Sequence, residues 1–195
     1  MFKITTLKSS LLGIVLISLS GVCSAFMVLS QEDALKQAFW AGATIEKETR
    51  ELTGDVLERV KERLGGNLVY FQEGAEQQEV ETRTTYDFYF GVKDGVRKGV
   101  AIIDVEPGKW GPVEFCTTLD VKGTVKSVRV LSYQEQRGQP IARNSFTNQY
   151  KGKHSNSTLT VGKDIIGVSG ATISSRSATF AVKKALVIYE ELYLK

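Results

Sequence analysis

The chain has 195 residues, of which 42% are hydrophobic and 24% are charged, so it is neither a disordered segment nor an unusually polar protein. Its formal net charge is +3, and two of those charges come from Lys3 and Lys8, because no acidic residue or arginine precedes Glu32. The rest of the chain is almost neutral, which argues against electrostatic binding of nucleic acid.

The first 30 residues have the pattern of a targeting segment. A positively charged start is followed by an apolar run from Leu11 to Leu19, and small residues before and at Ala25 predict cleavage there, with residues 1–25 as an export signal. The alternative is an uncleaved membrane anchor, because Ser9–Leu29 approaches the roughly 20 residues that span a bilayer. Both readings place the remaining chain in the periplasm or otherwise outside the cytoplasm.

Residues 31–66 predict two helices. Ser30 and Asp33 form a variant of the capping box, and an apolar stripe follows them. A second helix is predicted over Asp55–Leu64, and the glycine pair Gly65-Gly66 supplies its stop. We expect residues 31–97 to form an N-terminal segment of helices and strands packed on the main domain.

The following part of the chain, up to residue 133, is rich in β-branched and aromatic residues and predicts strands separated by short turns. The predicted strands are Asn67–Gln72, Thr84–Val92, Lys98–Val105, Val113–Leu119 and Thr124–Ser132. Short breaks at residues 93–95 and 120–123 are typical of hairpins. The sequence therefore predicts an α+β fold, with an antiparallel sheet of about five strands packed against helices.

The stretch that organises the C-terminal part is Ser169-Gly170-Ala171-Thr172-Ile173-Ser174-Ser175, which leads into apolar residues at helical spacing. We expect Ser174 or Ser175 to be the N-cap of a C-terminal helix. Thr172 would then lie on a tight turn just before a helix N-terminus, where a negative group is favoured. From spacing alone, an ordinary glycine-containing turn into a helix is the favoured explanation, because short motifs often match by accident.

A second notable stretch runs from Tyr133 to Ile141 and includes Glu135 and Gly138. It is polar, follows a strongly predicted strand, and carries both glycine and proline. On composition alone this is a solvated loop.

Both stretches resemble the signatures of FMN-binding domains. Such domains occur in the flavin-carrying subunits of Rnf-type and sodium-pumping NADH:quinone oxidoreductases, and in membrane regulators of nitrous-oxide reduction. Ser-Gly-Ala-Thr before a C-terminal helix resembles their flavinylation motif, and Tyr133, Glu135 and Gly138 match a Tyr-x-Glu-x-x-Gly signature. The resemblance covers about residues 98–190, which points to residues 98–195 as an FMN-binding domain.

The resemblance implies that FMN is attached to Thr172 through a phosphoester bond, by a flavin transferase that uses FAD as donor. The remaining residues of the turn, Ser169, Gly170, Ala171, Ile173 and Ser174, would then surround the attachment point. The family motif has an aspartate six residues before the threonine, whereas this chain has Ile166, and its nearest acid is Asp164.

The resemblance also implies that the loop starting at Tyr133 lies against the isoalloxazine ring. Glu135 would accept a hydrogen bond from a ring N–H, and Gly138 would let the backbone approach closely. Arg176 either pairs with the FMN phosphate or is solvated.

These features predict an electron-transfer protein that works with a membrane or periplasmic redox partner. The sequence has no nicotinamide-type glycine-rich turn, no haem-attachment motif and no phosphate loop, so a stand-alone enzyme is less well supported than a carrier. The alternative is a sensory or assembly module of a membrane redox complex that holds flavin non-covalently or not at all, and Ile166 supports that alternative.

Overall fold

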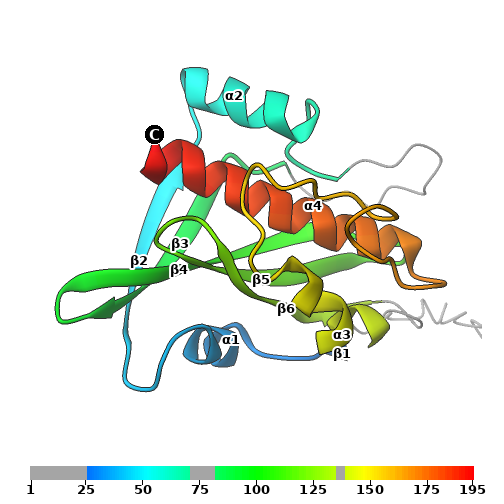
Figure 1. The fold of residues 1–195 in the computed structure, drawn as a ribbon, viewed down its shortest axis with the longest axis horizontal. Coiled ribbons are helices and arrows are strands. Elements are labelled where there is room, and N and C mark those ends of the chain that lie inside the picture. The colour runs from blue at the N-terminus through cyan, green and yellow to red at the C-terminus, as the bar shows by residue number, and fades with distance from the viewer. Residues whose placement is uncertain (1–25, 71–81, 135–138) are drawn as a thin grey trace, which may run out of the picture.

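The computed structural model describes residues 26–70, 82–134 and 139–195, which form one antiparallel sheet and several helices (Figure 1). The sheet order is β1-β6-β5-β4-β3-β2, and all neighbouring strands are antiparallel. The strands are β1 (Phe26–Met27), β2 (Thr44–Glu51), β3 (Thr85–Lys93), β4 (Val96–Pro107), β5 (Pro112–Asp120) and β6 (Val125–Tyr133). The α+β class predicted from the sequence is confirmed.

The helices divide between the two faces of the sheet. They are α1 (Gln31–Ala38), α2 (Gly54–Leu64), η1 (Gln139–Ala142), α3 (Asn144–Thr147), η2 (Asn148–Tyr150), α4 (Thr172–Tyr189) and the π-helical turn η3 (Glu190–Leu194). The long helix α4 lies across one face, α2 packs on α4, and α1 lies on the opposite face (Figure 1). Within the described residues, no helix has both the length and the apolar character needed to cross a bilayer.

The main hydrophobic core lies between α4 and the sheet. Apolar side chains of the central strands, such as Phe88, Ile102 and Phe115, meet Val182 and Leu186 of α4, and all five are buried. Burying such side chains contributes about 1.5–3 kcal/mol each. This core holds α4 against the sheet.

The four strands β3 to β6 lie close to their predicted positions. The hairpin turns between them lie at the turn residues that predicted them. Asp94 and Gly95 both have positive φ between β3 and β4, which suits a two-residue hairpin. Ser30 caps α1 by accepting the Asp33 N–H at 3.1 Å, and Gly65 ends α2 in the left-handed conformation, as predicted.

Two strand predictions need correction, in addition to the two-residue edge strand β1, which the sequence analysis also did not predict. The expected strand Asn67–Gln72 is not a strand over residues 67–70, and the last two of its residues lie outside the described part. Instead, side chains bind its backbone: the Leu68 carbonyl accepts a hydrogen bond from Lys184 at 2.8 Å, and the Tyr70 N–H donates to Glu106 at 2.7 Å.

The second correction is strand β2, which the sequence did not predict. Most of its residues are exposed, so it shows no apolar alternation. It is an edge strand paired with β3 alone, and polar contacts such as Thr49 to Asp87 at 2.6 Å and Arg97 to Glu48 at 2.8 Å hold it in place. Cross-strand polar pairs stabilise such edges without leaving a hydrophobic signal.

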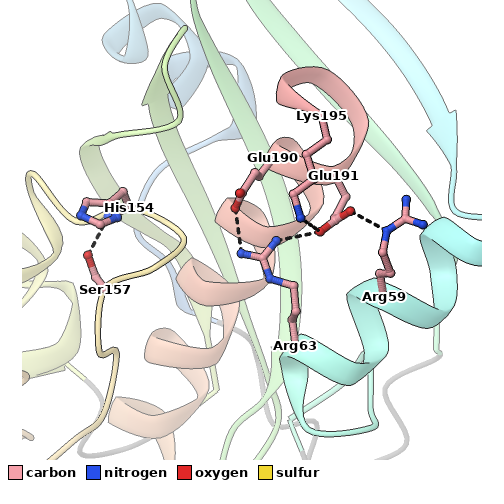
Figure 2. A network of polar contacts seen from close by, with 7 residues as sticks. All are labelled: Arg59, Arg63, His154, Ser157, Glu190, Glu191 and Lys195. Carbon is pink, nitrogen blue, oxygen red and sulfur yellow. Dashed lines mark hydrogen bonds and ion pairs between the residues drawn. The ribbon is translucent and has the colours of Figure 1, made fainter.

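A network of charged side chains joins α2 to the C-terminal end of α4 and η3 (Figure 2). Glu191, whose side chain is fully buried, accepts hydrogen bonds from Arg59 at 2.9 Å, from Arg63 at 2.8 Å and from Lys195 at 2.6 Å. Arg63 also pairs with Glu190 at 2.7 Å. Burial alone would raise the pKa of Glu191, but these three cations outweigh it and lower that pKa to about 2.

We predict that Glu191→Gln lowers the free energy of unfolding at pH 7 by about 1–3 kcal/mol, because two arginines lose a buried anionic partner. The folded-state pKa of Glu191 lies below its ordinary value of 4.5, so its contribution is complete above about pH 4.5 and is lost as pH falls toward 2. Denaturant unfolding across that window should therefore be less pH-dependent in the variant. Glu190→Gln is the matched control and should cost less, and equal losses for both variants would contradict this account.

Candidate functional site

The turn before α4 presents Thr172 to solvent. Ser169 and Gly170 are exposed, and Gly170 has a φ of +76°, a conformation that favours glycine. The Ala171 N–H donates to the Val168 carbonyl at 3.0 Å and closes the turn. Thr172 is the first residue of α4 and its side chain is exposed, so its hydroxyl is accessible to a partner molecule.

The predicted N-cap is wrong, because α4 begins about a turn earlier than expected. Ala171 occupies the N-cap position, and no side chain caps this end of the helix. Ser174 and Ser175 lie inside the first turn and are fully buried. The Ser175 hydroxyl accepts the Val168 N–H at 3.0 Å and donates to the Ala171 carbonyl at 2.9 Å, so it braces the turn from within the helix.

An uncapped helix N-terminus favours a bound anion. The first N–H groups of a helix have no partner within the helix, and its dipole places partial positive charge at the same end. At the start of α4 these groups lie beside the exposed Thr172. Arg176 follows one helical turn later and is also exposed, while Ile173 is half-buried between them.

The segment before the turn is held without the aspartate of the family motif. The Gln149 side chain accepts the Ile166 N–H at 2.7 Å and donates to the Ile166 carbonyl at 3.1 Å. The Ile166 side chain itself is 78% exposed. Asp164 accepts the Thr160 N–H at 2.9 Å and pairs with Lys153 at 3.0 Å, so it stabilises a different turn and does not replace the missing acid.

The residues of the second signature are only partly described. Tyr133 ends β6 and is buried, whereas Glu135 and Gly138 lie outside the described residues, so their predicted contacts with a flavin stay predictions. Downstream, Phe146 and Tyr150 form an edge-on aromatic pair in the core, and the Tyr150 hydroxyl lies 2.9 Å from that of Thr179 on α4.

A cavity of about 310 Å³ lies along α4 beyond Thr172. Its walls come from α4, from the connection before the turn and from the segment after α2. The lining residues are Tyr70, Leu159, Thr160, Val161, Arg176, Thr179, Phe180 and Lys183. Sequence reasoning missed this cavity because three segments far apart in the chain form it. The sequence held one signal for this cavity, because Arg176, Phe180 and Lys183 follow Thr172 at helical spacing.

A buried cluster of charges supports one wall of this cavity. Lys184 is 2% exposed, and its ammonium group lies 2.6 Å from Asp104 and 2.5 Å from Glu106, both also buried. It also donates to the Leu68 carbonyl, while Glu106 accepts the Tyr70 N–H. The cluster therefore fixes Tyr70 in place, and the ring of Tyr70 lies 5.9 Å from that of Phe180.

The charges in this cluster depend on one another. Burial alone would lower the pKa of Lys184, but the two neighbouring carboxylates outweigh it and raise that pKa. Burial raises the pKa of Glu106 to about 7, against the opposing effect of Lys184. Lys184 therefore carries a positive charge that compensates the negative charges of Asp104 and Glu106 on β4.

We predict that Lys184→Met lowers the free energy of unfolding by about 3–5 kcal/mol, because it leaves two buried carboxylates without their cation. Lys183→Met is the matched control: this adjacent lysine is only half-buried, and its loss should change stability by no more than about 0.5 kcal/mol. Denaturant unfolding of both variants measures the difference. Similar small losses would show that the cluster does not stabilise the fold.

Comparison with known proteins identifies part of the chain. Residues 108–187 match the family described as FMN-binding domain. Among solved structures, the chain is similar to NqrC of Shewanella oneidensis, with 15% identity, a TM-score of 0.47, and coverage of 72% of this chain and 77% of the other. It is also similar to one subunit of the Na(+)-translocating NADH-quinone reductase of Parabacteroides distasonis, with 19% identity, a TM-score of 0.43 and the same two coverages.

No curated protein matches the sequence. The match to the family spans β5, β6 and most of α4, and it includes the turn that carries Thr172. Residues 108–187 are therefore similar to an FMN-binding domain.

Proposed function

We propose that this chain is an electron-transfer protein that carries FMN on Thr172 through a phosphoester bond. The observation that carries the proposal is the position of Thr172 within the matched domain. Its exposed side chain stands at an uncapped helix N-terminus, next to a turn of small exposed residues. A hydroxyl nucleophile and a site for an anionic phosphate thus coincide at one residue.

The residues around Thr172 fit a phosphate diester. The N-terminus of α4 contributes about 0.3–1 kcal/mol for an exposed negative group. Arg176 adds a positive charge one turn along the helix, and within the described residues it forms no ion pair that would compete. Ser169 and Gly170 place no bulky side chain beside the hydroxyl.

Attachment of FMN is a substitution at phosphorus. The Thr172 oxygen forms a bond to the phosphorus on the FMN side of FAD, the pyrophosphate bond breaks, AMP leaves, and the hydroxyl proton passes to a base. We assign this step to a separate FAD-dependent flavin transferase. Bound FMN supplies one- and two-electron transfer, and the protein positions it and tunes its potential.

The proposed setting is outside the cytoplasm, with a membrane or periplasmic redox protein as partner. Support comes from the sequence of residues 1–25, which has the charge and apolar pattern of an export signal or anchor. A flavin fixed by a covalent bond cannot be lost by diffusion, which suits a carrier in that compartment.

A second candidate function is a sensory or assembly module that holds flavin non-covalently or not at all. Ile166 favours it, because the motif aspartate is absent and an exposed apolar side chain takes its place. The two candidates differ in the covalent state of Thr172.

We predict that the chain, co-expressed with a flavin transferase, gains the mass of one FMN less one water and shows flavin fluorescence in a denaturing gel. Thr172→Ala should abolish both signals, because it removes the attacking oxygen. Unmodified mass in the wild-type protein would favour the second candidate.

The chain provides its own control for this experiment. Gly42-Ala43-Thr44 repeats the tripeptide Gly170-Ala171-Thr172, and Thr44 is also exposed, but it begins strand β2 instead of a helix. Thr44→Ala should leave flavin attachment unchanged. If both variants lose flavin equally, attachment does not depend on the helix N-terminus.

A further inference from the structure

We infer that Gln149 is a positioning residue for the attachment of FMN to Thr172. Its side chain holds the backbone at Ile166, where the segment that leads to Thr172 begins. The inference rests on the proposed function for the identity of the reaction. It adds a residue from outside the turn, on which the position of the attacking hydroxyl depends.

The contact between Gln149 and Ile166 uses both polar groups of one side-chain amide. The Gln149 Oε1 atom accepts the Ile166 N–H at 2.7 Å, and the Gln149 Nε2 atom donates to the Ile166 carbonyl at 3.1 Å. An ionised carboxylate can only accept and an ammonium group can only donate, so neither could form both bonds. The amide thus pairs with the Ile166 backbone as a residue of a neighbouring antiparallel strand would.

The side chain at position 166 takes no part in this contact. The Ile166 side chain is 78% exposed, whereas its backbone N–H and carbonyl both bind Gln149. The contact therefore does not depend on which residue occupies position 166. This explains how the segment is held in a chain that has no acid there.

Gln149 is itself fixed to helix α4. It lies in η2 next to Tyr150, which is fully buried. The Tyr150 hydroxyl lies 2.9 Å from the hydroxyl of Thr179, which follows Thr172 by about two turns on the same face of α4. The amide that holds Ile166 and the proposed attachment residue are therefore connected to one helix.

A second contact holds the same segment two residues further along the chain. The Ser175 hydroxyl accepts the Val168 N–H at 3.0 Å. Between the two contacts, Gly167 leaves little room for a side chain, because a Cβ atom there would lie 2.8 Å from Val161. With Gln149 at one end and Ser175 at the other, the turn that follows starts from a fixed position.

Loss of the Gln149 amide would release one of these two contacts. The Thr172 hydroxyl would then occupy a wider range of positions, and a nucleophile that is less well aligned reacts more slowly. Gln149 is only half-buried, so its loss should change the stability of the whole protein little. A positioning role thus predicts slower attachment in a protein of nearly unchanged stability.

The test follows the gain of FMN mass over time in the full-length protein, with a purified FAD-dependent flavin transferase and FAD. We predict that Gln149→Ala lowers kcat about tenfold or more and leaves the KM for FAD unchanged, because FAD binds to the transferase. Gln149→Glu has the same size but cannot donate to the Ile166 carbonyl when ionised, so it should be as slow.

A second measurement needs no flavin. In unmodified Gln149→Ala, amide hydrogen exchange should become faster at residues 166–172 than in the wild-type protein, because the segment has lost one of its two contacts. Exchange in the central strand β5 should be unchanged.

Two matched controls separate the amide from other effects. Ile166→Ala removes the exposed side chain but keeps both backbone groups that bind Gln149, and Asn148→Ala removes an exposed amide from the adjacent residue. Both variants should keep the wild-type kcat. A control as slow as Gln149→Ala would overturn the inference.

Failure of the inference and failure of the proposed function give different results. If the wild-type protein gains FMN and Gln149→Ala reacts at the same rate, the inference is wrong and the proposed function stands. Unchanged exchange at residues 166–172, or a loss of stability throughout Gln149→Ala, would also overturn the inference. A wild-type protein that gains no FMN overturns the proposed function and the inference with it.

Discussion

The buried contact between Lys184 and the acids Asp104 and Glu106 is the interaction on which the arrangement of this molecule depends. Hydrophobic packing holds α4 on the sheet, but apolar contacts tolerate sliding more readily than a charge with two fixed partners does. Because all three groups are buried, a shift of α4 along its axis would leave charges without partners. The cluster thus sets the position of α4, and with it the place of Thr172 at the start of that helix.

The same cluster connects the fold to the site. Through hydrogen bonds to the Leu68 carbonyl and from the Tyr70 N–H, it holds an irregular segment against the side of α4. That segment supplies one aromatic wall of the cavity, and α4 supplies the other. At the start of α4, Ser175 braces the turn from inside the helix and leaves Thr172 facing solvent. Thr172 and one wall of the cavity thus belong to one rigid helix.

Local sequence chemistry predicted the parts of the structure that local forces determine. The turn at Asp94-Gly95, the left-handed cap at Gly65 and the central strands follow from residue preferences and from apolar patterning. Strand β2 could not be predicted, because an exposed edge strand held by charged pairs has no hydrophobic period. The start of α4 was misplaced because Ser175, a typical capping residue, acts here from within the first turn. The cavity depends on contacts between distant segments, which spacing along the chain does not reveal.

The central proposal is that the hydroxyl oxygen of Thr172 carries FMN, and peptide mapping tests this proposal most directly. Trypsin cleavage after Lys163 and Arg176 releases residues 164–176, a peptide with Thr172 and three serines. Tandem mass spectrometry of this peptide, from protein co-expressed with a flavin transferase, should locate one FMN phosphoester on Thr172. An FMN group on a serine of the same peptide, or a peptide that carries none, would contradict the account.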